Sequence, residues 1–266
     1  MAKQTDTSSL LKRRWKVILN IVTVLALIGG WLWLTWGGVV SDLFLPGPDE
    51  LWDAFVDLLD DGYKSRPLWV HISDSLIRVG VGFGTGAIMG TALGLAMGYS
   101  ATVDALAAPF VEFLRPLPQL AYLVLLIIWL GIGETSKITL LFLAALPVSA
   151  VAARDGVRNV SQARVRVARS LGANRWQIFR YVVFPSALAE IFTGARLAVG
   201  IVYGTLIAAE IIAGTTGIGW MILDAGRFLR SDYVFVGILI IGMMGIALDR
   251  LLLAAETHVV HWAGKQ

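Results

Sequence analysis

The 266-residue sequence contains no cysteine, and only 15% of its residues are charged. Without cysteine the chain has neither disulfides nor thiol chemistry, and its redox compartment stays open. A small charged fraction beside 57% hydrophobic residues is unusual for a soluble domain. The formal net charge of +3 does not indicate nucleic-acid binding, because the basic residues lie beside apolar segments rather than on one soluble face.

Several chemical motifs are also missing. There is no Gly-x-x-x-x-Gly-Lys-Ser/Thr phosphate loop, so the chain does not bind ATP in that way. No Ser/His/Asp grouping stands within an apolar segment, which argues against an intramembrane hydrolase. The three histidines, His71, His258 and His261, have no acid or thiol partners at metal spacing. We therefore expect them at the surface or the membrane interface, and we expect no bound metal, cofactor or catalysis in this chain.

Long uncharged segments dominate what is present. At about 1.5 Å per residue, a helix of 16 to 22 residues spans roughly 24–33 Å, close to the hydrocarbon thickness of a bilayer. Three segments reach 18 residues or more, and three are shorter but have fewer polar flanking residues than a buried helix of a soluble protein would have. We predict an all-α integral membrane domain over residues 17–256 with six transmembrane helices. The six segments are Val17–Trp36, Val79–Ser100, Pro116–Gly133, Ile138–Ala153, Leu197–Ala209 and Tyr233–Leu248.

The placement of Lys and Arg predicts the orientation of these segments. The tail 1–16 is basic, whereas Gly37–Pro67 is rich in Asp and Glu. The first apolar run is too long for a signal peptide and ends in several tryptophans, so a retained first helix is expected. Lys and Arg favour the cytoplasmic side. With six crossings, tails 1–16 and 257–266 and an arginine-rich loop, 156–188, are predicted to be cytoplasmic.

Two local patterns predict helix packing. In segment Pro46–Tyr63, apolar residues recur at helical spacing, which predicts a short helix that anchors at the outer membrane face rather than one that docks a partner. In the second span, five glycines recur at intervals of four, so they share one face on which a second helix can approach closely. These glycines are Gly82, Gly86, Gly90, Gly94 and Gly98.

Prolines and ionisable residues interrupt the later spans. Glu112 and Arg115 stand directly before Pro116 and Pro118, which remove backbone donors and predict a discontinuous helix. The two charged residues fit either a transport path or paired positions at the inner surface, and the sequence leaves both readings open. Pro147 predicts a break in the fourth span.

The fifth span carries two further polar candidates. Tyr203 and Glu210 lie seven residues apart on one helical face, near the outer half of the span. An ionisable residue among apolar neighbours in a membrane helix is costly. For Glu210, a functional role is favoured over simple pairing.

The stretch from Arg166 to Pro185 has the most specific spacing in the chain. It predicts a helix that ends near Gly172, a turn, and a second short helix over Asn174–Val183 that Pro185 stops. An apolar face of Trp176, Phe179 and Val183, with arginines at its rim, suits a protein interface. Contact with lipid headgroups is the alternative, but it does not require the glycine and proline spacing, so docking is favoured.

This stretch resembles the Glu-Ala-Ala loop of inner-membrane permease subunits of ATP-binding-cassette importers. The family spacing is matched by Val167-Ala168, Gly172, Val182 and Phe184-Pro185, whereas Arg166 stands where the family often has Glu. Between Leu45 and Asp249 further stretches look like the sulfonate, nitrate and taurine branch of these permeases. They are Arg115-Pro-Leu-Pro118, Trp129-Leu-Gly-Ile-Gly-Glu-Thr-Ser-Lys137, Ser170-Leu-Gly-Ala173 and Ala208-Ala-Glu210.

The resemblance implies a six-helix type I importer permease of the MetI-like fold in the bacterial inner membrane. It implies a homodimer, two cytoplasmic ATPase subunits that bind ATP-Mg, and an external substrate-binding protein. The cargo would be a small sulfonate such as taurine. The residues expected to couple the chain to the ATPase are Ala168, Gly172, Ala173, Asn174, Arg175, Trp176, Phe179, Val182 and Pro185.

The expected substrate path consists of Glu112, Arg115, Pro116, Pro118, Tyr203 and Glu210. Arg115 is the candidate for a sulfonate group and Glu112 or Glu210 for an ammonium group, on the basis of depth and charge alone. Nitrate, bicarbonate, other alkanesulfonates and a pyrimidine precursor stay open as cargo. A secondary transporter or channel is the rival class, although no internal inverted repeat is visible.

Overall fold

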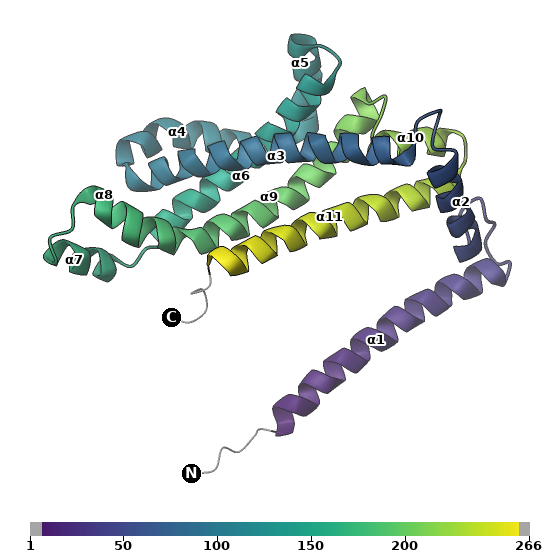
Figure 1. The fold of residues 1–266 in the computed structure, drawn as a ribbon, viewed down its shortest axis with the longest axis horizontal. Helices are drawn as coiled ribbons and strands as arrows, with labels where there is room; N and C mark the ends of the chain where they lie inside the picture. Colours follow the sequence, from purple (N-terminus) through teal and green to yellow (C-terminus); the bar gives the residue numbers. More distant parts are fainter. Residues whose placement is uncertain (1–6, 261–266) are drawn as a thin grey trace.

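The computed structural model describes residues 7–260, and within α1 the side chains of 7–14, 16 and 17 are not described. The described part of the chain is helical, and an isolated bridge between Tyr63 and Arg66 is its only β pairing (Figure 1). Parts of both predicted tails lie outside these residues, and His261 lies outside them entirely. The all-α prediction is confirmed.

Four long helices run side by side and form the body of the molecule (Figure 1). They are α3 (Leu68–Tyr99), α6 (Glu134–Arg158), α9 (Phe184–Ala213) and α11 (Ser231–Val259). α6 is the most buried of them and packs against both α3 and α9, while α11 packs on α9. Leu141, Ala145, Val202 and Leu206 lie in the apolar core between these helices.

The glycines of α3 explain why α3 and α6 approach so closely. A Cβ atom added at Gly82 or Gly86 would overlap Leu141 or the carbonyl oxygen of Phe142, and at Gly94 it would overlap the carbonyl oxygen of Ala150. Gly90 and Gly98 meet α6 in the same way. Because the contacts are with backbone atoms and with Cβ atoms fixed to the backbone, no larger residue fits while the helices keep this separation.

The third predicted span is broken. α4 (Ala101–Leu114) and α5 (Gln119–Leu130) meet at an angle of 100°, and α5 stands away from the long helices (Figure 1). Pro116 and Pro118 lie in the break, as predicted. The predicted discontinuous helix is therefore confirmed, and the bent pair begins at Ala101, well before the predicted segment Pro116–Gly133. The described residues hold five helices able to cross a membrane, or six if this bent pair counts as one.

α1 (Thr7–Trp36) diverges from the body and approaches it only near its carboxyl end (Figure 1). There, Nε1 of Trp31 donates a hydrogen bond of 3.2 Å to the carbonyl of Pro46. The apolar side chains described along α1 are almost all exposed. The helix begins ten residues before the predicted span, and α11 likewise runs on to Val259.

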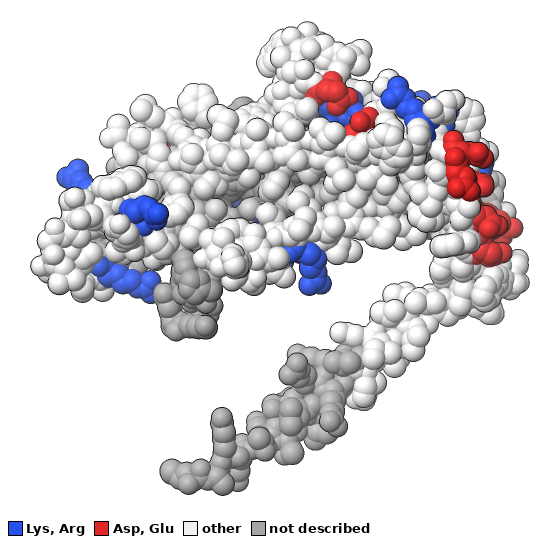
Figure 2. All heavy atoms as spheres, viewed as in Figure 1, with Lys and Arg blue, Asp and Glu red and all other residues white. Residues whose placement is uncertain are grey.

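The two ends of the body differ in their charge. One end, called here the α10 end, carries α2 (Pro48–Asp60) and α10 (Ile218–Arg227); the other, the α7–α8 end, carries α7 (Gln162–Ser170) and α8 (Arg175–Ile178). Asp and Glu gather over α2, and Lys and Arg over the α7–α8 end (Figure 2). The predicted helix α2 is confirmed, and it packs on α11 with Ala54 and Leu58 buried.

Two prolines do not end helices where the sequence predicts. Pro147 lies buried inside a continuous α6, and Pro185 lies in the first turn of α9, so both predicted breaks are wrong. The chain passes from α8 through a π-helical segment, η1 (Phe179–Val183), directly into α9. In this segment the N–H of Phe184 bonds to the carbonyl of Phe179, five residues back. The wider π turn relieves the clash that a proline ring makes with the preceding α-helical turn.

Candidate functional site

The turn between α7 and α8 is closed by a glycine with left-handed backbone geometry. Gly172 has φ +83°, a conformation that costs other residues about 1 kcal/mol or more. Its N–H bonds to the carbonyl of Arg169 at 2.9 Å, and the N–H of Ala173 bonds to the carbonyl of Ala168 at 3.0 Å. This pair of bonds is a Schellman motif, which ends α7 at the predicted position.

α8 begins with a reciprocal cap. The N–H of Gln177 donates to Oδ1 of Asn174 at 2.9 Å, and the N–H of Asn174 donates to Oε1 of Gln177 at 2.8 Å. Such a capping box satisfies two backbone donors at the start of a helix. The predicted sequence of helix, turn and helix is therefore confirmed.

The α7–α8 segment has a small apolar core of its own. Val165, Ile178 and Val183 are buried together with Val157 from α6 and Ala187 from α9. The segment is thus packed onto the ends of two long helices, and a force on its surface would reach both helices through close contacts.

The apolar residues predicted to form one face lie in different surroundings. Val183 is buried in this core, whereas Trp176 is 68% exposed and stacks on Phe179, with ring centroids 5.9 Å apart. Trp176 and Phe179 line a groove of about 540 Å³ against Ala96 and neighbouring residues of α3. Leu171, at the turn itself, is 81% exposed, and it forms the apolar tip of the segment.

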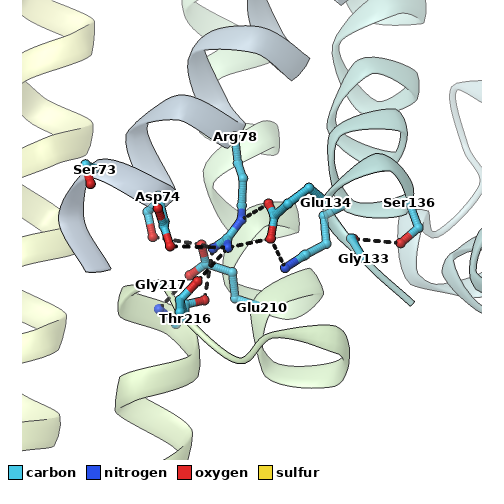
Figure 3. A network of polar contacts seen from close by, with 12 residues as sticks. Ser73, Asp74, Arg78, Gly133, Glu134, Ser136, Glu210, Thr216 and Gly217 are labelled. Atoms are coloured by element: carbon cyan, nitrogen blue, oxygen red, sulfur yellow. Dashed lines mark hydrogen bonds and ion pairs between the residues drawn. The ribbon is translucent and has the colours of Figure 1, made fainter. Parts of the chain in front are cut away.

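A polar network lies at the α10 end (Figure 3). The buried guanidinium of Arg78 donates to both oxygens of Glu134, at 2.6 and 2.8 Å, and to Oε1 of Glu210, at 2.6 Å. It also donates to the carbonyl and the hydroxyl oxygen of Thr216, both at 2.9 Å. All five N–H groups of Arg78 are engaged, as a buried guanidinium requires.

The same network holds the turn from α9 to α10 in place. Ser75 donates to Oε1 of Glu210 at 2.7 Å and accepts the N–H of Ile218 at 3.0 Å. Gly219 donates its N–H to Oε2 of Glu210 at 2.8 Å. Gly217 has φ +109°, and a Cβ there would overlap the side chains of Glu210 and Arg78. The network therefore ties α3, α6 and α9 to this turn.

His71 belongs to the same region, which corrects the prediction of a surface position. It is fully buried and stacks on Trp220, with ring centroids 5.7 Å apart. One of its ring nitrogens, Nδ1, lies 3.3 Å from the backbone N–H of Gly217. No group of three or more His, Cys, Asp or Glu within residues 7–260 could hold a metal ion.

Arg78 was missed by sequence reasoning because it stands one residue before the uncharged run that defined the second span. A signal was available. His71, Ser75 and Arg78 precede Gly82 at spacings of four, three and four, so they continue the face that carries the packing glycines. Polar residues on a packing face point to buried partners.

A second polar group lies beside the network, outside the spans. Asp224 of α10 accepts a hydrogen bond of 2.8 Å from Tyr63 and an ion pair of 2.6 Å from Lys64. Burial raises the pKa of Asp224, but the hydrogen bonds from Lys64 and Tyr63 outweigh it and hold the pKa below its ordinary value. Burial and the bond to Asp224 raise the pKa of Tyr63. These bonds fasten the 61–67 loop to α10.

The residues predicted for the substrate path fall into two separate groups. Glu112 lies at the α7–α8 end, 3.2 Å from Nη1 of Arg154, and Arg115 lies in the α4–α5 break beside Pro116 and Pro118. Tyr203 is buried in the core, and Glu210 belongs to the network of Arg78. The structure thus separates Glu112 and Arg115 from Tyr203 and Glu210.

The chain belongs to the family of binding-protein-dependent transport system inner membrane components, whose model matches residues 82–260. It is 40% identical over 260 residues to the taurine transport system permease protein TauC of Escherichia coli K12, an alignment that covers 96% of this chain and 94% of that protein. It is 31% identical to the nitrate import permease protein NrtB of Synechocystis, with 92% of this chain and 90% of that protein covered.

The fold also matches solved transporters. A chain of the MetNI methionine ABC transporter in an inward-facing conformation aligns with a TM-score of 0.56, over 70% of this chain and 95% of that chain, at 20% identity. A putative aliphatic sulfonates transport permease protein, SsuC of Bacillus subtilis, is 33% identical and covers 91% of this chain and 84% of its own length. The chain is therefore a multi-pass inner-membrane component with a MetI-like fold.

Proposed function

We propose that this chain is the permease subunit of an ATP-driven importer and forms the inward path for a small sulfonate such as taurine. The observation that carries the proposal is the 40% identity to a taurine permease over nearly the whole length of both chains. Likeness to aliphatic sulfonate and nitrate permeases supports alkanesulfonates and nitrate as the alternative cargoes.

The α7–α8 segment is proposed to dock on a separate ATPase subunit, which would hold ATP-Mg and perform the hydrolysis. The tip of the segment is exposed, and its apolar residue Leu171 is surrounded by arginines. The rest of the segment is packed onto the ends of α6 and α9. Exposed apolar residues within a polar rim are typical of protein interfaces. Ala168, Gly172, Ala173 and Asn174 build the turn, and Arg175, Trp176, Phe179, Val182 and Pro185 follow it into α9.

The charge distribution supports the predicted orientation. Lys and Arg at the α7–α8 end favour the cytoplasm for that end, and the acidic α2 then faces outward (Figure 2). On this orientation both termini are cytoplasmic, the α10 end meets an external substrate-binding protein, and the membrane domain comprises residues 17–256. The exposed apolar residues of α1 and α5 suit contact with lipid or with a second copy of the chain in a homodimer.

For the substrate path, the structure favours a revision of the predicted roles. Glu210 is fully engaged by Arg78, Ser75 and Gly219, and we assign it to the α9–α10 turn rather than to cargo. Arg115, with Pro116 and Pro118, stays in the proposed path because the α4–α5 break leaves it at the surface of the bundle. Discontinuous helices commonly line transport paths.

Uptake in proteoliposomes tests this function. The chain is reconstituted with the ATPase subunit and the binding protein of its importer, and labelled taurine is supplied on the binding-protein side. We expect ATP-dependent taurine accumulation that ceases when the ATPase is omitted. Unlabelled nitrate and ethanesulfonate serve as competitors. Taurine entry through the chain alone would instead identify a channel or secondary transporter. If nitrate competed better than taurine itself, the cargo would be nitrate.

A further inference from the structure

A cavity of about 200 Å³ with apolar and charged walls lies between α6, α9 and the α4–α5 break. Its walls carry Arg115 from the break, Asp155 from α6, and Glu190 and Thr193 from α9. Gly194 forms part of the wall, where a Cβ would overlap the side chain of Ala152. Pockets for drug-sized ligands measure roughly 300–1,000 Å³, so this cavity suits a molecule of only a few non-hydrogen atoms.

The three charged groups of this cavity do not neutralise one another. Within residues 7–260, the guanidinium of Arg115 makes no hydrogen bond or ion pair. Oε1 of Glu190 accepts a hydrogen bond of 2.9 Å from the neutral amide of Asn159. Oδ1 of Asp155 forms an ion pair of 3.7 Å with Nε of Arg154, a separation longer than a hydrogen bond. The cavity thus presents a cation and two carboxylates that retain free hydrogen-bonding capacity.

The balance of charge limits the class of ligand. A simple anion would meet one guanidinium but two carboxylates, and a simple cation would meet the unpaired guanidinium. A molecule that carries both an anionic and a cationic group can pair its anion with the guanidinium and its cation with the carboxylates. Guanidinium suits an oxyanion because its planar N–H groups match two oxygens at once.

We propose that this cavity is a transient binding site for a small zwitterion with a sulfonate-like group on Arg115 and an ammonium group between Asp155 and Glu190. The proposal rests on the proposed function and names its specificity: zwitterionic aminosulfonates are favoured over plain alkanesulfonates and nitrate. Asp155 and Glu190 replace Glu112 and Glu210 as the ammonium partners, because the latter two line no part of this cavity and accept hydrogen bonds from Arg154 and Arg78.

Calorimetric titration of the full-length chain in detergent tests the site without ATPase or binding protein. The probes are taurine, ethanesulfonate, which lacks the ammonium group, and ethylammonium, which lacks the sulfonate. Charged hydrogen bonds of the size usual in proteins predict that Arg115→Gln weakens taurine binding at least about 10-fold. The double variant Asp155→Asn/Glu190→Gln should weaken taurine binding by a similar factor and strengthen ethanesulfonate binding, since it removes two repelling charges.

Arg158→Gln, at the same end of the bundle, and Asp60→Asn, on α2, are the matched controls and should bind taurine as the unmodified chain does. Opposite effects of the double variant on the two sulfonates cannot come from general loss of folding. Equal changes for both sulfonates, ethylammonium binding as tight as that of taurine, or no taurine binding by the unmodified chain at millimolar concentration would each overturn the site. None of these results depends on the uptake assay, so the proposed function can stand or fall separately.

Discussion

Replacing Arg78 with methionine is expected to lower the free energy of unfolding by about 3–5 kcal/mol, because it leaves the buried carboxylate of Glu210 without its cationic partner. Glu134 keeps Lys137, whose Nζ lies 2.7 Å from Oε1, so the main loss falls on Glu210. Circular dichroism during titration with a denaturing detergent measures the change.

A matched control and a second variant make this prediction specific. Arg66→Met removes an exposed arginine from the same end of the bundle and should change the free energy of unfolding by less than about 0.5 kcal/mol. The double variant Arg78→Met/Glu210→Met removes both charges and should recover part of the loss, since a buried ion pair replaced by apolar residues is often tolerated. Unfolding of Arg78→Met at the same denaturant concentration as the unmodified chain would refute the role of this network.

The second large effect is expected at the contact of α3 with α6. Gly94→Val places side-chain atoms where the carbonyl oxygen of Ala150 lies. A backbone atom cannot move aside as a flexible side chain can, so the helices must separate. We expect a loss of at least the ~1–3 kcal/mol typical of overpacked cores, together with reduced yield of folded protein.

Gly84 supplies the control for this variant. It lies on the same helix, yet no described atom would lie within 4 Å of a Cβ added there, outside its own local helix backbone. Gly84→Val therefore carries the same change in helix propensity without the overlap, and it should leave the unfolding curve nearly unchanged. If the two variants were equally unstable, the loss would come from valine in the helix rather than from the α3–α6 contact.

The parts of the fold that follow from local patterns could be predicted from the sequence. Each of these patterns lies within one helix or turn. They are the spacing of the glycines in α3, the position of Gly172, and the pair Pro116 and Pro118. The local structure that each pattern produces can therefore be predicted from the residues of that segment alone. The end of α7 and the interruption between α4 and α5 are found where these residues indicate.

The parts that depend on distant partners could not be predicted. Whether Pro185 ends a helix depends on the π turn before it, and the partner on which His71 stacks, Trp220, lies far along the chain. Arg78 and Glu210 lie 132 residues apart, so their pairing leaves no local signal. For the same reason the sequence did not predict that Asp155 and Glu190 share a site. Only the packing of α6 on α9 places them beside Arg115.

Site-directed cross-linking tests the central claim most directly, and the absence of cysteine makes the chain well suited to it. Leu171→Cys, at the exposed tip of the α7–α8 segment, is labelled with a photoreactive maleimide in membranes that contain the whole importer. Trp52→Cys, on exposed α2 at the opposite end, is the control. Illumination should attach the ATPase subunit to position 171 and not to position 52. ATPase adducts at position 52, or none at position 171, would contradict the assignment of the α7–α8 segment as the docking element.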